Sequence, residues 1–206
     1  RLGKYMIIKT LVENTSISDD FRNEHGLSLF IATKKHKILF DLGASELFAE
    51  NAEKLGVDLA AVDIVVISHG HYDHGGGLKT FLKLNSQAKI YLNQKAFEKH
   101  YSNQANSDKK YIGLDEELLT NSRLVFVNDH LVIDEELELF LDVQGKKLTS
   151  KGNLDLLKQA NEKLTPDDFS HEQNLLIHEH QKTALFAGCA HNGIVNIIDR
   201  VIDMRN

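Results

Sequence analysis

A strand-like run that ends in a cluster of potential metal ligands constrains this chain more than any other feature of the sequence. Residues 62–67 are mostly apolar and β-branched, which is typical of a strand buried on both faces. The run is followed directly by the segment SHGHYDHGGGL, residues 68–78. A rigid strand end can hold ligands to the tolerance that a metal ion needs. The sequence therefore predicts a metal site at the end of a buried strand.

Three imidazoles and a carboxylate lie within six residues of this segment. His69 and His71 are two positions apart, so on an extended chain they point the same way and can share one metal. Asp73 and His74 follow as the chain turns, and they can face a second metal nearby. The glycines at 75–77 let the backbone turn sharply beside the site. The alternative, a solvated histidine-rich loop, does not account for the position at a strand end.

Two cations that share a water lower its pKa toward neutrality, so hydrolysis is the expected chemistry. Asp73 is the expected catalytic residue, because it can hold the second metal and accept a proton from that water. An imidazole-rich set suits zinc best, and manganese or iron can be accommodated. We therefore expect a dinuclear, metal-dependent hydrolase that acts on a phosphoester, ester or related bond.

Composition narrows the classes of partner. A chain of 206 residues is long enough for one domain with a sizeable core, and we expect residues 1–206 to form one. No run approaches the ~20 apolar residues of a membrane span. The single cysteine fits a reducing cytoplasm, and the net charge of -6 argues against nucleic acid as the main partner. A small-molecule substrate is expected, and the oligomeric state is left open.

The rest of the chain alternates between short apolar runs and helical stretches, which predicts two packed sheets with helices outside. Strands are expected at 5–12, 27–33, 37–41, 62–67 and 89–92, in a meander at 124–127, 131–133 and 137–143, and in a hairpin of 174–178 and 183–187 that turns at Gln181-Lys182. Helices are expected at 45–55, 78–84 and 194–202, and loops at 102–113 and 144–165.

The HxHxDH segment after an apolar strand resembles the signature of the metallo-β-lactamase superfamily. LFDLGAS, residues 39–45, resembles its upstream strand-turn motif, whose aspartate, here Asp41, is expected to orient a ligand imidazole or a loop amide. A narrower match joins VENT (12–15), HGLS (25–28), SHGHYDH (68–74) and GCAHNGIVNI (188–197). That set is similar to the dihydropterin ribofuranosylaminobenzene-phosphate synthase-like subgroup of metal-dependent hydrolases.

The resemblance implies an α/β (α+β) fold, the four-layer αβ/βα sandwich of the metallo-β-lactamase type. It implies two divalent ions at one edge between the sheets, with His69 and His71 on the first, and Asp73 and His74 on the second. Alternative functions are a synthase-type condensation on a ribosyl-phosphate or pterin substrate, and a non-catalytic metal-binding protein. Relatives continue past the last helix into another strand and a final histidine ligand, so we expect residues 1–206 to be a C-terminally incomplete domain that lacks its last strand or strands.

Three further positions take roles from the same resemblance. His191 resembles a further ligand, with a capping residue of the last helix as the alternative. Cys189 stands where many relatives carry a bridging aspartate, and it is either a zinc-binding thiolate or a small buried side chain. His171 precedes it by 18 residues, as a third histidine does in many relatives, and it is either a ligand or an orienting or surface residue. Five histidines lie at no spacing that is typical of metal ligands, and we predict them to be surface residues: His36, His100, His130, His178 and His180.

Overall fold

The computed structural model describes residues 5–103 and 109–205, whose strands form three sheets. In hydrogen-bonded order, the first sheet holds β1 (Ile7–Val12), β2 (Ser28–Ala32), β3 (Lys37–Phe40), β4 (Ile64–Val66), β5 (Lys89–Leu92) and β8 (Leu124–Phe126). The second holds β14 (Lys182–Phe186), β13 (Asn174–Glu179), β10 (Leu137–Phe140) and β9 (Leu131–Val132). The small third sheet holds β12 (Lys163–Pro166), β11 (Leu156–Ala160), β6 (His100–Ser102) and β7 (Lys110–Tyr111).

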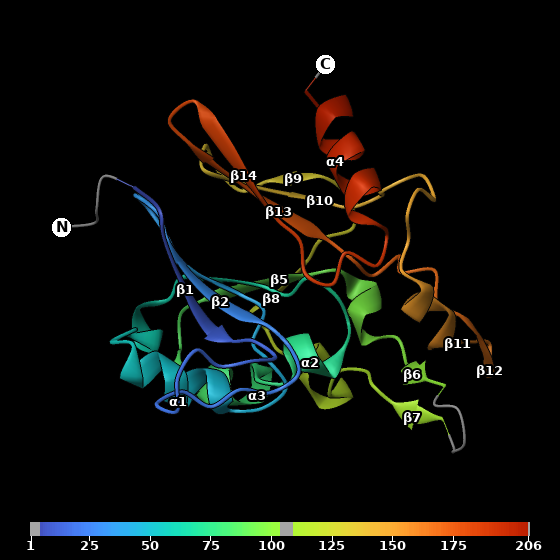
Figure 1. Ribbon diagram of the computed structural model, residues 1–206, viewed down its shortest axis with the longest axis horizontal. Coiled ribbons are helices and arrows are strands. Elements are labelled where there is room, and N and C mark those ends of the chain that lie inside the picture. The colour runs from blue at the N-terminus through green and yellow to red at the C-terminus, as the bar shows by residue number, and fades with distance from the viewer. Residues whose placement is uncertain (1–4, 104–108, 206) are drawn as a thin grey trace.

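Helices lie outside the first two sheets (Figure 1). The α-helices are α1 (Leu47–Lys54), α2 (Tyr72–Gly75), α3 (Leu78–Leu84) and α4 (Ile194–Asp203). Short 3-10 helices cover Leu59–Ala61, Gln94–Phe97, Glu116–Thr120 and Lys151–Asp155. No helix in the described part of the chain is long and apolar enough to cross a membrane.

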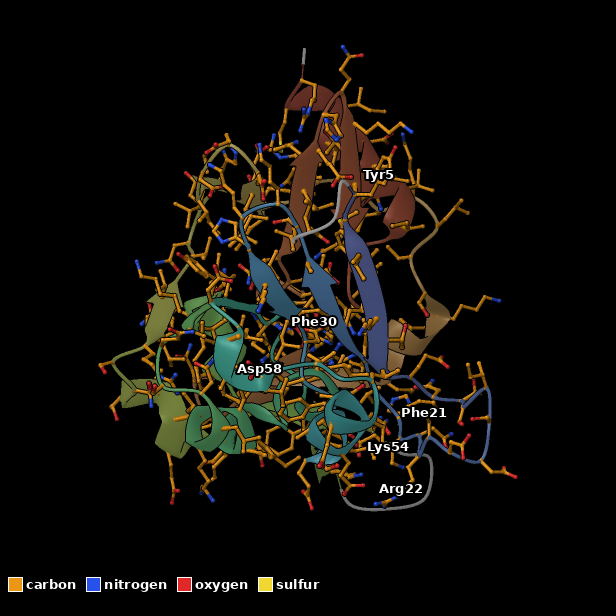
Figure 2. The ribbon with its side chains drawn as sticks, turned by 90° about the vertical axis from the view of Figure 1, so that its left-hand side faces the viewer. Tyr5, Phe21, Arg22, Phe30, Lys54 and Asp58 are labelled. Carbon is orange, nitrogen blue, oxygen red and sulfur yellow. The ribbon has the colours of Figure 1, made fainter. Side chains whose placement is uncertain are left out.

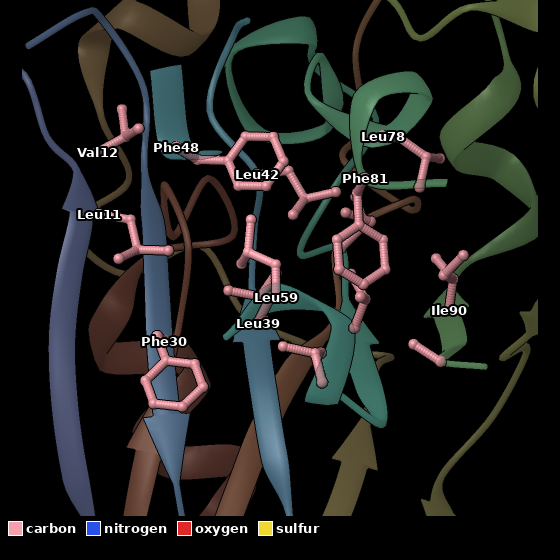
Figure 3. Close-up of a cluster of buried hydrophobic side chains, with 14 of the residues drawn as sticks. Leu11, Val12, Phe30, Leu39, Leu42, Phe48, Leu59, Leu78, Phe81 and Ile90 are labelled. Carbon is pink, nitrogen blue, oxygen red and sulfur yellow. The ribbon is translucent and has the colours of Figure 1, made fainter. Parts of the chain in front are cut away.

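Three apolar clusters separate the molecule into four layers. Leu39 packs with the helix residues Phe48 and Phe81 (Figure 3), whereas the next residue, Phe40, packs with the second sheet. Neighbouring strand residues point to opposite faces, so β3 contributes to both clusters. In the second sheet, Phe140 packs with Ile197 of α4. The layer order is therefore helix, sheet, sheet, helix, which confirms the predicted fold class.

The parallel strands β3, β4, β5 and β8 bring several strand ends to one edge of the first sheet. Asp41 follows β3, and Ser68 lies two residues beyond β4. The two segments touch, because the Ser68 amide donates to Asp41 Oδ1 at 2.6 Å. The edge at which the sequence predicted a metal site is thus the edge where these segments converge.

The loop between β1 and β2 folds back over α1 (Figure 2). Lys54 donates to the carbonyl oxygen of Asp20 at 2.6 Å, and Arg22 forms an ion pair with Glu50 at 3.0 Å. The loop continues past the helix until His25 Nε2 lies 3.3 Å from Asp73 Oδ2. The same contacts that anchor this loop therefore place a histidine beside the predicted catalytic residue.

Most predicted elements are present, with small shifts in their ends. The predicted bounds of α3 and β5 are confirmed. Helix α1 begins at Leu47, after Ser45, whose hydroxyl accepts from the Leu47 amide at 3.2 Å. The hairpin turn falls at His180-Gln181, one residue before the predicted position.

Two predictions of local structure are wrong. Residues 124–127 do not begin a meander, because β8 pairs in parallel with β5 in the first sheet. The predicted loop at 144–165 contains β11 and the start of β12, which pair as a hairpin. Both strands are mostly half-exposed, and neither LLKQA nor KLTP alternates between apolar and polar residues, so no periodicity marks them. Of the loop predicted at 102–113, residues 104–108 lie outside the described residues.

Candidate metal centre

Glycines allow the predicted ligands to approach one another closely. A Cβ on Gly70, between His69 and His71, would lie 2.2 Å from the carbonyl oxygen of Ala96. A Cβ on Gly188 would lie 2.2 Å from Ser68 Oγ. Both distances are shorter than any side chain tolerates, so only glycine lets the end of β14 and the Gln94–Phe97 turn pack against the histidine segment.

Asp41 orients two of the predicted ligands. His74 Nδ1 donates to Asp41 Oδ2 at 2.6 Å. His69 Nδ1 donates at 2.8 Å to Ser68 Oγ, which in turn donates to Asp41 Oδ2 at 2.7 Å. Histidines that bind metals have their other ring nitrogen held in this way. The structure thus places Asp41 where the resemblance expected an orienting group.

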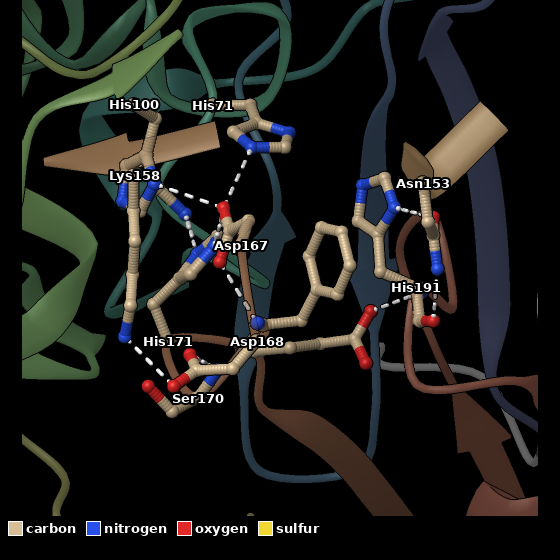
Figure 4. Close-up of polar contacts among 12 residues, drawn as sticks. His71, His100, Asn153, Lys158, Asp167, Asp168, Ser170, His171 and His191 are labelled. Atoms are coloured by element: carbon tan, nitrogen blue, oxygen red, sulfur yellow. Dashed lines mark hydrogen bonds and ion pairs between the residues drawn. The ribbon is translucent and has the colours of Figure 1, made fainter. Parts of the chain in front are cut away.

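His191 lies against His69 and is oriented by a residue that sequence reasoning missed. The two ring centroids are 5.0 Å apart. Asn153 Oδ1 accepts from His191 Nδ1 at 2.9 Å (Figure 4). The ring of His191 also stacks on that of Phe169. Nε2 of His69 and Nε2 of His191 are buried without a hydrogen-bond partner among the described residues. Unpaired buried nitrogens are costly, so these two atoms are candidates for metal ligation.

Both imidazoles are held in the neutral form that a metal requires. Burial, aided by the neighbouring His71, lowers the pKa of His191 to about 3. Burial and the nearby His74 likewise hold the pKa of His69 well below its ordinary value. Neutral imidazole is the ligating form, because protonation would occupy the donor atom.

Cys189 lies between two groups of donor atoms. The donors of His69, Cys189 and His191 lie within 4.8 Å of one another, and so do those of Asp73, His74 and Cys189. Cys189 Sγ is 3.2 Å from His74 Nε2, which is 3.4 Å from Asp73 Oδ2. The thiol is exposed, which excludes the reading of Cys189 as a small buried side chain. These five residues are called the Cys189 centre below.

Asp73 and His74 each stabilise the charged form of the other. Burial opposes the charged form of His74, but Asp41, Asp73 and Cys189 outweigh it and raise its pKa well above the ordinary value. Burial likewise opposes ionisation of Asp73, and His74 with His71 outweighs it, so the pKa of Asp73 is lowered. The Asp73 side is therefore an ionised carboxylate beside a histidine that readily carries positive charge.

His171 is not a surface residue, since its side chain is fully buried. Its Nδ1 accepts from the Gly70 amide at 2.8 Å, and its Nε2 lies 3.2 Å from Asp167 Oδ2. No atom of His171 is among the donor atoms that meet at Cys189, and its ring centroid lies 5.9 Å from that of His69. His71 Nε2 also faces Asp167 Oδ2, at 3.9 Å, while the His71 ring stays 4.6 Å from that of His69.

The two residues after His171 fasten the surrounding loops. Glu172 accepts from the amides of His191 and Asn192 at 2.7 and 3.1 Å. Gln173 Nε2 donates to the carbonyl oxygens of Ile67 and Tyr91 at 2.8 and 2.9 Å. This short peptide therefore joins the ends of β4 and β5 to the loop that carries His191.

The reading of His100 as a surface residue is wrong. Its side chain is fully buried, and its Nδ1 is 3.1 Å from Asp167 Oδ2 (Figure 4). His100 begins β6 of the third sheet, far along the chain from the histidine segment, so no local spacing marked it. Asp167 was missed for the same reason. His36 is also half-buried, between Asp63 and Asp134.

Comparisons with known proteins agree with this architecture. The model of the metallo-beta-lactamase superfamily matches residues 22–197, so the chain belongs to that superfamily. Within it, the chain is similar to Tm1679, whose crystal structure is described as a metal-dependent hydrolase of the beta-lactamase superfamily. The identity is 32%, the match covers 97% of this chain and 72% of the other, and the TM-score is 0.78.

Two proteins of Methanocaldococcus jannaschii are also similar to the chain. An uncharacterized protein is 29% identical, with 94% of this chain and 73% of the relative covered. The 7,8-dihydropterin-6-methyl-4-(beta-D-ribofuranosyl)-aminobenzene-5'-phosphate synthase is 26% identical, with 98% and 74% covered. A quorum-quenching N-acyl homoserine lactone lactonase shares the fold alone, at 16% identity, with 86% and 73% covered and a TM-score of 0.52.

Proposed function

We propose that the chain is a hydrolase whose Cys189 centre holds two divalent cations, most suitably zinc, and acts on a phosphoester, ester or related bond. The observation that carries the proposal is the sharing of Cys189 by two donor groups. His69 and His191 complete one group, and Asp73 and His74 complete the other. His71 remains a proposed ligand beside His69.

The donor set fits zinc on chemical grounds. Imidazole, thiolate and carboxylate are the usual zinc ligands in proteins. The unpartnered Nε2 atoms of His69 and His191 supply two donors that nothing else in the described chain satisfies. Each has its Nδ1 held by a neighbouring polar side chain, as ligating histidines do. Manganese or iron would find the nitrogen and oxygen donors acceptable but match the thiol less well.

When bound, the cations supply Lewis acidity, which lowers the pKa of a water and polarises the electrophilic group of the substrate. Asp73 presents an ionised oxygen that accepts a hydrogen bond from the attacking water and orients it. His25 lies on the solvent side of the same oxygen, 3.3 Å away and largely exposed. Asp41 and Ser68 keep the rings of His69 and His74 in place throughout.

A polar cavity lies next to the loop that carries His191, and none of the five residues of the Cys189 centre lines it. Its volume is about 790 Å³, and it is lined in part by Phe169, Glu172 and Asn192, which surround the His191 loop. Two lysines and four acidic residues line it: Lys95, Lys146, Asp129, Asp142, Asp168 and Glu172. The charge of this lining therefore does not select between a neutral and an anionic substrate.

A second candidate function is a synthase-type condensation on a ribosyl-phosphate or pterin substrate. It is favoured by the 26% identity to the Methanocaldococcus jannaschii synthase across 98% of this chain.

Zinc-loaded protein tested against a phosphodiester, a lactone and a thioester separates these functions. We expect turnover of at least one of them, lost on chelation and in Asp73→Asn. Condensation of a pterin with a ribosyl phosphate, without hydrolysis, would establish the synthase function instead. Failure of all four assays with zinc, manganese and iron would contradict both proposals in favour of a binding protein.

A further inference from the structure

A cavity lies where the loop between β1 and β2 folds back over α1 (Figure 2). Its volume is about 420 Å³, which is within the range of small-molecule sites in proteins. The walls come from β1, from residues 13–22 of the loop, and from α1 with the residue that follows it. None of the five residues of the Cys189 centre lines the cavity, so it is a separate site. It is called the Asn51 cavity below.

The walls of the Asn51 cavity are mainly apolar. Leu11 is buried, and Phe21 and Leu55 are half-buried. Ile17 also lines the cavity, although its side chain is 99% exposed, so it lies at the rim. An apolar molecule in the cavity would remove part of this surface from water, which is favourable. The body of a ligand is therefore expected to be apolar.

The charged side chains of the lining already have partners. Lys9 Nζ donates to a carbonyl oxygen of the cavity wall at 2.7 Å. Arg22 forms its ion pair with Glu50 at 3.0 Å, and Glu13 Oε2 accepts from the Thr15 hydroxyl at 2.7 Å. A charged ligand would have to compete with these contacts, so the lining favours a neutral molecule.

Asn51 is the buried polar residue of the lining whose hydrogen bonds are incomplete. Its side chain is 2% exposed, and its Nδ2 donates to the carbonyl oxygens of Leu11 and Arg22 at 2.7 and 2.9 Å. Asn51 Oδ1 is buried and has no hydrogen-bond partner among the described residues. An unpaired buried acceptor is costly, and an N–H or O–H group of a ligand would satisfy it.

The loop that covers the cavity continues to the Cys189 centre. Glu24 Oε1 accepts from the Ala44 amide at 2.9 Å, and Asn14 Oδ1 accepts from the Gly26 amide at 3.0 Å. His25, which contacts Asp73, lies between these two anchored positions. A molecule that fixes residues 13–22 would therefore also restrict the segment that carries His25.

We propose that the Asn51 cavity binds a neutral, mainly apolar small molecule that donates one N–H or O–H group to Asn51 Oδ1. The apolar walls hold the body of the molecule, and the unpaired acceptor selects for the donor. Once bound, the molecule holds the loop that carries His25 against α1. Binding at this site does not depend on the proposed hydrolysis.

Indole and benzofuran test the proposal on the full, unmodified chain. The two molecules have nearly the same shape, but only indole has an N–H group to donate. We expect indole to shift the backbone amide resonances of residues 9–22 in a saturable way. Benzofuran should bind about tenfold more weakly, because it leaves Asn51 Oδ1 unpaired. Equal affinities, or the largest shifts outside the residues that line the cavity, would overturn the proposal.

The place of binding is tested by Thr10→Trp, which fills the cavity from an exposed position on β1 where strands accept aromatic side chains. Thr183→Trp makes the same change at an exposed position of the edge strand β14 and is the matched control. We expect the affinity for indole to fall about tenfold or more in Thr10→Trp and to stay unchanged in Thr183→Trp. Unchanged affinity in both variants would overturn the proposal.

Amide hydrogen exchange tests the hold on the loop. We expect indole to slow exchange across residues 13–26 of the unmodified protein and to leave it unchanged in Thr10→Trp. Equal exchange with and without saturating indole in the unmodified protein would contradict the hold on the loop.

Discussion

The two groups of residues that meet at His71 differ in how far solvent reaches them. In the Cys189 centre the thiol is exposed, and Asp73 contacts His25, whose side chain is 73% exposed. Around Asp167, in contrast, His100 and His171 are fully buried. The residue types are nearly the same, and the two groups share a ring contact. A substrate can therefore reach the Cys189 centre, whereas the imidazoles around Asp167 are closed to it.

Replacement of Asp73 should have the largest effect and should fall on one side of this comparison only. Asp73→Asn removes the ionised oxygen that orients water in the proposed mechanism. We expect the rate of hydrolysis to fall ~10³-fold, equivalent to about 4 kcal/mol of transition-state stabilisation. Asp19→Asn, an exposed aspartate in the loop before β2, serves as control. Unchanged kcat in Asp73→Asn would remove Asp73 from the mechanism.

Cys189 should matter to both proposed cations of its centre. Cys189→Ala removes the donor that the two groups share. We expect the affinity for both ions to fall by one to two orders of magnitude in competition with a chelator. Cys189→Asp offers an oxygen in place of sulfur and should restore most of it. Loss of only one ion in Cys189→Ala would show that the thiol does not bridge.

Asp41 tests how much the orientation of the ligand imidazoles contributes to metal affinity at the Cys189 centre. Asp41→Asn keeps the shape of the side chain but weakens the hold on His74 Nδ1 and, through Ser68, on His69. Outer partners of this kind are worth roughly 10- to 100-fold in metal affinity. We expect a loss in that range at the Cys189 centre, measured by chelator titration. Unchanged affinity in Asp41→Asn would show that the hold on these rings does not contribute to metal binding.

At His36 one imidazole lies between two carboxylates, whereas around Asp167 several imidazoles surround one carboxylate. Replacement of His36 is expected to have the smallest effect, and that effect is on stability. Burial lowers its pKa, but hydrogen bonds to Asp134 and Asp63 outweigh burial and raise it above the ordinary value. A raised pKa stabilises the fold fully below the unfolded value near 6.5 and loses that contribution as pH rises through the folded value. We expect His36→Gln to lower the free energy of unfolding by roughly 0.5 to 1 kcal/mol at pH 5.5, in the range of partly exposed ion pairs, and by less at pH 8.5.

Urea unfolding at both pH values measures the effect, with His180→Gln as a surface control. A stability difference between unmodified protein and His36→Gln that grows with pH would contradict the assigned direction. The contrast with the imidazoles around Asp167 is physical: two carboxylates raise the pKa of His36, whereas burial lowers the pKa of His171 to about 4.

Local sequence was sufficient where the chain itself sets the spacing. His69, Asp73 and His74 lie in one segment after a strand, and their convergence follows from strand and turn geometry. Cys189 and His191 needed the family resemblance, because they arrive from another sheet. Asn153 and His100 escaped both approaches. Their neighbours in the chain carry no apolar alternation, and only the third sheet, whose half-exposed strands were also missed, brings them to the site.

The amide of Gln173 spans the space between the two large sheets at the edge where the ligands lie. At the opposite edge, the turn after β2 is tied to the loop before β10 by His36 with Asp134 and by Thr33 with Glu136. The Gln173 amide does not titrate, whereas the contact at the opposite edge includes the imidazole of His36, which does. As the pH rises, we therefore expect the two sheets to separate first at the edge that His36 holds. The ligand edge would act as the hinge, so the most mobile state of the molecule still holds its metal donors together.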